Sequence, residues 1–308
     1  MSDDGALIHA RGLTKRFGGL TAVDGIDFDV RKGEAFGFLG PNGAGKSSTM
    51  RMIGCVSPVT AGTLRVLDRD PATDGPAIRS RLGVVPQLDT LDNELTVREN
   101  LVIYGRYFGL SRKELRVRAD ELLEFVQLSE RANDPVEPLS GGMKRRLTIA
   151  RSLVNDPDVL LLDEPTTGLD PQARHVVWDR LYRLKQRGVT LVLTTHYMDE
   201  AEQLCDRLVI MHQGTIAEEG SPPELIQRLS TREVVELRFA GETPPVDGVF
   251  DGAAARIEEL PDRVLLYTDD GDALVPIAHE RLNPQSVLVR RSTLEDVFLR
   301  LTGRTLVD

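Results

Sequence analysis

The chain has 308 residues, which is enough to bury a substantial core and to form one large domain with a smaller one. Its formal net charge of −10 argues against a general nucleic-acid binder, because such proteins usually present a basic surface. No stretch approaches the run of about 20 apolar residues that crosses a bilayer, and the acidic N-terminus lacks the basic start of a signal peptide. We therefore expect a cytoplasmic protein whose membrane role depends on a partner.

The first part of the chain predicts antiparallel strands and then one buried strand. Residues 7–10 form one candidate strand, and in 26–30 apolar and acidic residues alternate, as on a half-buried strand. The apolar segment 35–40 runs into a glycine-rich turn, and a helix is expected to begin near Lys46.

Short apolar strands then alternate with helical patterns. Strands are expected at 82–86, 159–163, 190–194 and 208–211, and helices at 96–108, 112–127, 141–154, 172–187 and 198–205. Buried strands that alternate with helices predict an α/β fold with a mostly parallel sheet. The helical segment 92–138 interrupts this rhythm, and we interpret it as an inserted helical subdomain.

The pattern changes after Gly220. A short helix is expected from Ser221 to Leu229, because Ser followed by two prolines is a helix start. Residues 231–308 predict a small, separate α+β domain, with strands at 234–239, 263–268 and 287–290 and a helix at 293–301. These residues hold nine arginines, no lysine and 15 acidic residues, so they carry most of the net negative charge.

The strongest motif follows the strand at 35–40. It reads Gly40, Pro41, Asn42, Gly43, Ala44, Gly45, Lys46, Ser47 and fits G-x-x-x-x-G-K-[ST] in full. Glycines let the backbone close around a phosphate, while consecutive N–H groups and a helix N-terminus face the anion. Lys46 can reach the β- and γ-phosphates of ATP, and Ser47 can ligate Mg²⁺. The motif predicts a nucleoside-triphosphate site.

Two acids end the apolar run at 159–163. Asp163 and Glu164 would lie at the carboxyl edge of the sheet, where ligands bind in folds of this class. Asp163 would hold Mg²⁺, and Glu164 would polarise the attacking water as a general base. Alone, such a pair is more often a solvated strand end, and the phosphate-binding motif upstream is what favours the catalytic interpretation.

A further string, Leu139-Ser140-Gly141-Gly142-Met143, lies between these two motifs, 23 residues before Asp163. With them it resembles the signature and Walker motifs of the ABC ATPase family. Met143 stands where the commonest family version has Gln. The resemblance covers about residues 7–225 and implies the fold of that family: a P-loop NTPase with a mostly parallel core sheet, an N-terminal antiparallel β subdomain and the helical subdomain.

The resemblance also implies roles for residues outside the motifs already named. It implies that Gln87 senses Mg²⁺ and the attacking water, that His196 contacts the γ-phosphate, and that Asp170 belongs to a loop crossing a dimer interface. It extends the ATP contacts of the phosphate loop to Ser48. Phe17 matches the aromatic position that stacks on adenine, although an aromatic near a first strand is often a core residue.

The family arrangement implies that two copies, or this chain and a similar subunit, pack head to tail. Each ATP would be held by the Lys46 loop of one chain and by Ser140, Gly141 and Gly142 of the other. Helix N–H groups after Ser140 would then face the γ-phosphate across the interface. ATP would form part of that interface, and its hydrolysis would loosen the pair.

The strings at 92–100, 194–202 and 292–303 resemble the daunorubicin-resistance and nodulation-factor branch, the ATPase subunits of ABC-2 type exporters. This branch implies a separate multi-span membrane subunit, a place at the cytoplasmic face of the membrane, and export of a drug-like, lipid or oligosaccharide compound. An importer subunit, or a soluble ABC ATPase acting on ribosomes or DNA, remains as an alternative. For residues 231–308 we expect an accessory domain that supports the dimer.

Overall fold

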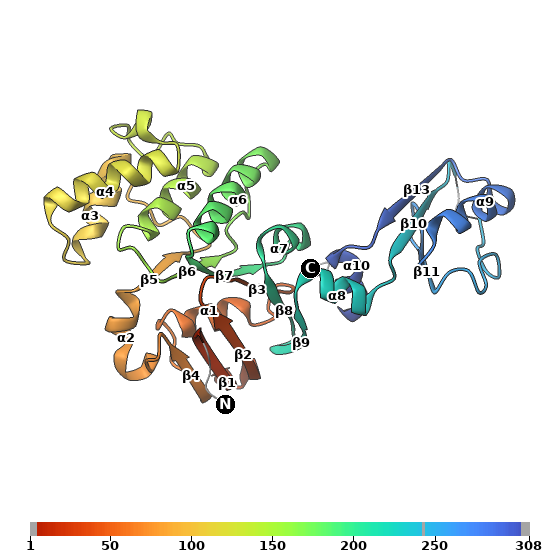
Figure 1. The fold of residues 1–308 in the computed structure, drawn as a ribbon, viewed down its shortest axis with the longest axis horizontal. Coiled ribbons are helices and arrows are strands. Elements are labelled where there is room, and N and C mark those ends of the chain that lie inside the picture. Colours follow the sequence, from red (N-terminus) through yellow and green to blue (C-terminus); the bar gives the residue numbers. More distant parts are fainter. Residues whose placement is uncertain (1–4, 242–243, 303–308) are drawn as a thin grey trace. The chain divides into compact units, whose positions relative to one another are not determined.

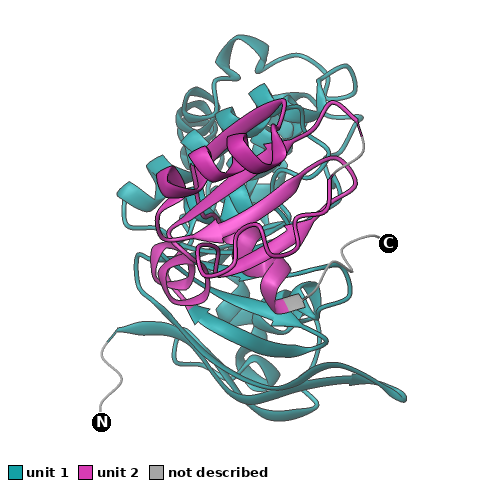
Figure 2. Ribbon diagram, turned by 90° about the vertical axis from the view of Figure 1, so that its right-hand side faces the viewer, with its two compact units in different colours: residues 1–219 teal, residues 220–308 magenta. Residues whose placement is uncertain are grey.

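The computed structural model describes residues 5–241 and 244–302. The chain divides into two compact units, residues 1–219 and 220–308, shown in different colours in Figure 2. The division falls at the end of strand β9 (Thr215–Gly220), so helix α8 (Pro222–Leu229) belongs to the second unit. The domain expected over residues 7–225 would end inside this helix.

The first unit is built around a six-stranded sheet with the order β5-β6-β7-β3-β8-β9 (Figure 1). From β5 to β8 every neighbouring pair is parallel. The expected α/β fold with a mostly parallel sheet is therefore confirmed. The remaining strands of this sheet are β3 (Ala35–Leu39), β5 (Leu82–Val85), β6 (Val159–Asp163), β7 (Thr190–Thr195) and β8 (Arg207–His212).

Helices cover this sheet and connect its strands. Helix α2 was not anticipated, because Gly75 and Pro76 are poor helix formers; Asp70 caps it by accepting a hydrogen bond from the Ala72 N–H at 2.8 Å. The connecting helices are α1 (Lys46–Ile53), α2 (Pro71–Arg79), α6 (Pro171–Gln186) and α7 (Met198–Leu204).

A separate antiparallel sheet precedes and flanks the core, with the order β2-β1-β4. Its strands are β1 (Ala6–Phe17), β2 (Leu20–Arg31) and β4 (Ala61–Val66). The strands expected at 7–10 and 26–30 are thus parts of much longer ones, and β4 was missed because only Leu64 and Val66 of it are buried. Phe28 of β2 packs at 5.1 Å, ring centroid to centroid, from Phe38 of β3, which joins the two sheets in one core.

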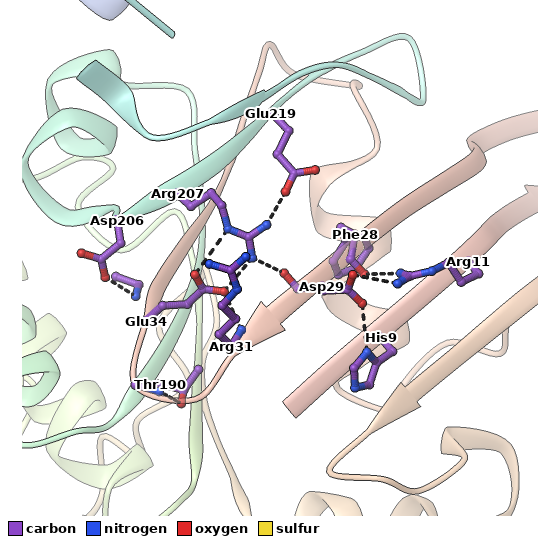
Figure 3. A network of polar contacts seen from close by, with 12 residues as sticks. His9, Arg11, Phe28, Asp29, Arg31, Glu34, Thr190, Asp206, Arg207 and Glu219 are labelled. Carbon is purple, nitrogen blue, oxygen red and sulfur yellow. Dashed lines mark hydrogen bonds and ion pairs between the residues drawn. The ribbon is translucent and has the colours of Figure 1, made fainter. Parts of the chain in front are cut away.

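A polar network also ties the two sheets together (Figure 3). Arg207 of β8 donates to the backbone carbonyl of Asp29 on β2 at 2.5 Å and to the Glu34 carboxylate at 2.9 Å, and it pairs with Glu219 of β9. The Asp29 side chain in turn accepts from Arg11 of β1 at 2.7 Å. One guanidinium therefore connects three strands and the turn before β3.

The segment after β5 is helical, as the sequence predicted, and its helices gather at one side of the first unit in Figure 1. Capping boxes begin two of these helices: Thr96 with Glu99, and Ser111 with Glu114. The elements are α3 (Val97–Arg106), α4 (Arg112–Phe125), the 3₁₀ turn η1 (Ser129–Arg131) and α5 (Gly141–Ser152).

The second unit holds an antiparallel sheet with the order β11-β12-β10-β13, and helix α9 packs on one of its faces. Strand β11 and helix α9 were not anticipated, the helix because Pro276 lies inside it. The elements are β10 (Glu233–Arg238), β11 (Arg256–Glu259), β12 (Val264–Thr268), α9 (Gly271–Leu282), β13 (Ser286–Arg291) and α10 (Leu294–Thr302). Across the described parts of both units, no helix has the length and apolarity that a bilayer span requires.

Candidate nucleotide site

The phosphate-binding motif forms the turn between β3 and α1, as expected. Gly45 stands at the N-cap of α1 with φ +103°, a backbone conformation that side chains rarely adopt. A Cβ at this position would lie 2.4 Å from the carbonyl oxygen of Ala22, so only glycine fits. The turn therefore presents the N-terminus of α1 and its unpaired N–H groups at the carboxyl edge of the sheet.

The side chain of Lys46 lies under this turn. Its Nζ donates to the carbonyls of Gly40 at 2.7 Å and Pro41 at 2.9 Å, and the residue is only 4% exposed. Burial lowers the pKa of Lys46, and the nearby charges of Glu164 and Asp163 partly offset that effect. A buried cation balanced by two carboxylates is well placed to meet a phosphate.

Hard oxygen donors gather beside the loop. The Ser47 hydroxyl donates to Asp163 Oδ1 at 3.2 Å, and the Thr194 hydroxyl donates to the same oxygen at 2.5 Å. Magnesium in nucleotide sites is held by one or two protein oxygens together with phosphate oxygens and water. Ser47 and Asp163 fit this donor set, and no cluster of three or more His, Cys, Asp or Glu side chains suited to a metal occurs in the described residues.

Glu164 lies next to these donors, immediately after β6, and is 7% exposed. Its Oε2 accepts from Gln87 Nε2 at 3.0 Å and from the Thr167 hydroxyl at 3.1 Å. His196 Nδ1 lies 3.4 Å from Glu164 Oε1 without hydrogen-bond geometry. Gln87, Glu164 and His196 were singled out from three distant parts of the sequence, and the fold brings them together around one carboxylate.

The backbone holds Glu164 in an unusual conformation. Its φ is +46°, in the left-handed region that few residues other than glycine adopt. The Glu164 N–H donates to the carbonyl of Thr194 at 3.1 Å and to its hydroxyl at 3.0 Å, so neighbouring strand β7 fixes this turn. Local strain that the surroundings enforce is typical of functional positions.

The signature residues lie apart from the phosphate loop. Ser140 is the N-cap of α5, where its Oγ accepts from the Met143 N–H at 3.3 Å. Asp170 caps α6 by accepting from the Ala173 N–H at 2.8 Å, and a Cβ on Gly142 would lie 2.8 Å from Ala173 Cβ. Two helix N-termini therefore lie side by side. Among the described residues, no hydrogen bond or ion pair links Ser140 with Lys46 or Ser47.

Phe17 is the expected adenine contact. It ends β1, is 49% exposed, and lies 4.7 Å, ring centroid to Nζ, from Lys15. Its contact with adenine stays a prediction. Ser48 is the third residue of α1 and follows Ser47 directly.

Arg145 was not anticipated from the sequence. It projects from α5, one turn after the signature glycines, and its guanidinium donates to the carbonyls of Asp163 and Glu164 at 3.1 Å, of Pro165 at 2.6 Å, and of Pro86. Burial lowers its pKa to about 10, so it stays charged at neutral pH. No pattern in the sequence reveals this role, because the carbonyls belong to segments that meet α5 only in the folded protein.

Comparison with known proteins places these motifs in a family. The family model "ABC transporter" matches residues 23–167, and the model "Nodulation factor export protein NodI, C-terminal domain" matches residues 246–303. The Nod factor export ATP-binding protein I of Ralstonia nicotianae is 47% identical over 307 residues, covering 98% of this chain and 95% of that protein. The protein of the same name from Rhizobium sp. strain N33 is 46% identical over 297 residues, covering 96% and 97%.

The chain belongs to the ABC transporter ATP-binding family. Its relatives are ABC export ATPases, so the expected ATPase activity and the export branch are confirmed, and nothing supports the importer or the ribosome- or DNA-associated alternatives. As an ABC ATPase domain, it binds ATP.

Solved structures agree with this assignment. A dimeric ATP-binding cassette bound to ADP and Pi in a post-hydrolysis state has a TM-score of 0.64 and 28% identity, covering 70% of this chain and 98% of that one. CbiO1 of Clostridium perfringens, part of an ABC transporter complex, has a TM-score of 0.67 and 26% identity, covering 73% and 95%. ABC cassettes of this kind form dimers.

Proposed function

We propose that this ABC ATPase hydrolyses Mg²⁺-ATP at a site shared between two chains and thereby powers export through a separate membrane subunit. The observation that carries the proposal is the convergence of Gln87, Glu164 and His196 beside Lys46 and the pair Ser47–Asp163. Residues 7–225 act as the nucleotide-binding domain, and residues 231–308 as an accessory domain that supports the dimer.

The loop from Gly40 to Ser48 binds the phosphates. Its N–H groups and the N-terminus of α1 face the anion, and Lys46 exchanges its contacts with the carbonyls of Gly40 and Pro41 for phosphate oxygens. Ser47 and Asp163, with Gln87, hold Mg²⁺, which when bound neutralises the charge that develops on the phosphates. Phe17 contributes an exposed ring for adenine to stack on.

Glu164 acts as the general base. Its carboxylate is buried and held by Gln87 and Thr167, so it is oriented before the attacking water arrives. It takes a proton from this water as the water attacks the γ-phosphorus, and the bond to ADP breaks. His196, beside the same carboxylate, contacts the γ-phosphate and stabilises its charge.

The second half of each site comes from the other chain. Ser140, Gly141 and Gly142 offer the N-terminus of α5, and Asp170 lies at the neighbouring N-terminus of α6, where it crosses the interface. Within one chain these groups are not joined to Lys46 or Ser47 in the described structure, which supports an arrangement in which each ATP bridges two chains.

The exported compound contacts the membrane subunit, so its class is inferred from the relatives. They carry the name Nod factor export ATP-binding protein I, which favours a compound of the Nod factor kind within the wider class of drug-like, lipid or oligosaccharide substrates. The chain acts at the cytoplasmic face of the membrane, attached through a multi-span subunit, and needs no nucleic acid.

Reconstitution with the multi-span membrane subunit that co-purifies with this chain tests this function. In inside-out vesicles, Mg²⁺-ATP should drive uptake of the compound into the vesicle, and the uptake should disappear when Glu164→Gln replaces the wild-type chain. A chain bearing Glu130→Gln, the same substitution at an exposed residue outside the site, is the control and should support uptake. Outward movement from the vesicle would indicate an importer, and co-purification with ribosomes instead of a membrane protein would contradict transport altogether.

A further inference from the structure

A cavity of about 680 Å³ lies between helices α4 and α6 and the segment before β6. It shares no residue with the nucleotide site. Its wall includes four arginines and one aromatic ring: Arg118, Arg180, Arg183, Arg187 and Phe125. The size of the cavity falls within the range of small-molecule sites in proteins.

The first of these arginines is already paired. Arg118 donates to Asp156 at 2.9 Å and to the carbonyl of Leu153 at 3.0 Å, and it lies 3.8 Å from Glu121. Two of the acidic residues on the cavity wall, Asp156 and Glu121, are therefore paired with Arg118. The wall then has one further acid, Glu124.

Arg180 is different, because it is largely buried and no ion pair is formed by it among the described residues. It is 6% exposed, and its Nε has no hydrogen-bond partner there. Its guanidinium lies 5.9 Å from the Phe125 ring centroid, and that of Arg187 lies 5.0 Å from the same ring. Burial and the like charge of Arg183 lower the pKa of Arg180, and the charge of Asp179 partly offsets this effect.

A buried and unpaired cation costs several kcal/mol relative to a paired one. Basic side chains near a helix C-terminus are common because they complement the helix dipole, and this explains the exposed Arg183 and Arg187 at the end of α6. It does not explain Arg180, which is buried and lies closer to the middle of the helix. Arginines gathered on one cavity wall, with one of them largely buried, are the chemistry that binds an oxyanion.

We propose that this cavity binds a small multivalent oxyanion, phosphate or pyrophosphate in character, with Arg180 as the central ligand and Arg183 and Arg187 at its mouth. Planar guanidinium groups match phosphate oxygens in paired hydrogen bonds, which is why arginine predominates at such sites. Because the wall combines α4 of the helical segment with α6 of the core, the bound anion braces these two helices against each other.

Calorimetric titration of the full chain with inorganic pyrophosphate tests the proposal. Lys46→Ala is present in every sample, so that the phosphate loop competes as little as possible, and the buffer lacks Mg²⁺ and keeps its ionic strength constant. We expect one site per chain, and Arg180→Gln should weaken binding by about tenfold or more, since charge-assisted hydrogen bonds contribute about 1.5–3 kcal/mol.

The matched control is Arg116→Gln, which removes the same charge from an exposed position of α4 outside the cavity wall. It should leave the affinity within about twofold of the starting protein. Equal weakening by both variants, or no heat of binding to the starting protein at millimolar pyrophosphate, would overturn the proposal. Arg183→Gln decides the matter if Arg180→Gln does not fold, because Arg183 is exposed, and it should weaken binding by a few fold.

The source of the phosphate group is distinguished by parallel titrations. Stronger binding of pyrophosphate than of orthophosphate or a sugar phosphate would indicate a free polyphosphate ligand. Stronger binding of the sugar phosphate would indicate a phosphorylated metabolite, for which the apolar side chains beside Phe125 offer contacts.

Discussion

The phosphate-loop half and the signature half of the nucleotide site differ in what a single chain provides. In the first half, Lys46, Asp163 and Glu164 are buried or half-buried, and the same chain supplies their hydrogen-bond partners. In the second half, Ser140 and Asp170 cap the helices on which they stand. One half is joined by contacts within a single chain, whereas the other consists of capped helix N-termini that form no hydrogen bond to Lys46 or Ser47 in the described residues.

This difference has a physical origin. Parallel strands bring their carboxyl ends to one edge of a sheet, so residues distant in sequence meet there without help from a second molecule. A helix N-terminus offers N–H groups and positive dipole to whatever anion reaches it. In the proposed two-chain site, the first half would therefore set the chemistry, and the second would make that chemistry depend on a partner.

The largest effect on ATP turnover is expected at Glu164, the proposed general base. Glu164→Gln should lower ATP turnover by about 10²–10⁴-fold, because the water loses its general base, while ATP affinity stays unchanged. Phosphate release in steady state and fluorescence titration of a labelled nucleotide measure the two quantities. A turnover rate equal to that of the wild type would rule out this role.

Ser140→Arg tests the signature half and should lower ATP turnover in both sites of a homodimer by about 100-fold. This is the size of the effect when an enzyme loses a hydrogen-bond donor that stabilises the charge of the transition state. ATP affinity of the isolated monomer should stay within about twofold, because no hydrogen bond joins Ser140 to the phosphate loop in the described part of the chain. Equilibrium dialysis at a concentration where the chain is monomeric checks this. A large loss of monomer affinity would contradict the shared-site arrangement.

Arg145 connects the two halves, since it stands on the signature helix and donates to the carbonyls on either side of Glu164, the proposed general base. Arg145→Lys keeps the charge but loses the planar fork, and it should lower kcat about tenfold with KM for ATP within about twofold. It should also reduce the cooperativity of hydrolysis with respect to ATP. Arg151→Lys, on the same helix and bonded to Thr90, is the control. A rise in KM without a fall in kcat would show that Arg145 supports binding instead.

The smallest effect is expected on stability, from loss of the cap that Asp170 provides for α6 of its own chain. Asp170→Ala removes the hydrogen bond to the Ala173 N–H and should lower the free energy of unfolding by about 1 kcal/mol. Asp170→Ser keeps a capping oxygen and should retain most of that stability. Urea unfolding of the monomer measures both. If both variants were as stable as the wild type, Asp170 would not stabilise its own helix.

The sequence predicted those strands and helices whose local pattern is strong. Continuous apolar runs predicted the buried strands β3, β6, β7 and β8, since both faces of such strands are covered. The missed elements are β4, β9 and β11, which carry exposed or half-exposed residues, and α2 and α9, which contain proline. In these elements a weak helix or strand propensity was overridden by tertiary packing, which cannot be read from the local sequence.

The sequence by itself determined the phosphate loop, because eight consecutive residues specify both the backbone conformation of the turn and the position of its lysine. It also identified the distant residues that are candidates for the rest of the site. Only the tertiary structure decided what surrounds them. The carbonyl of Pro86 that Arg145 contacts lies 59 residues away along the chain, and Arg180 is buried among arginines from its own helix and from α4. Such contacts depend on packing between elements, which residue type and spacing do not encode locally.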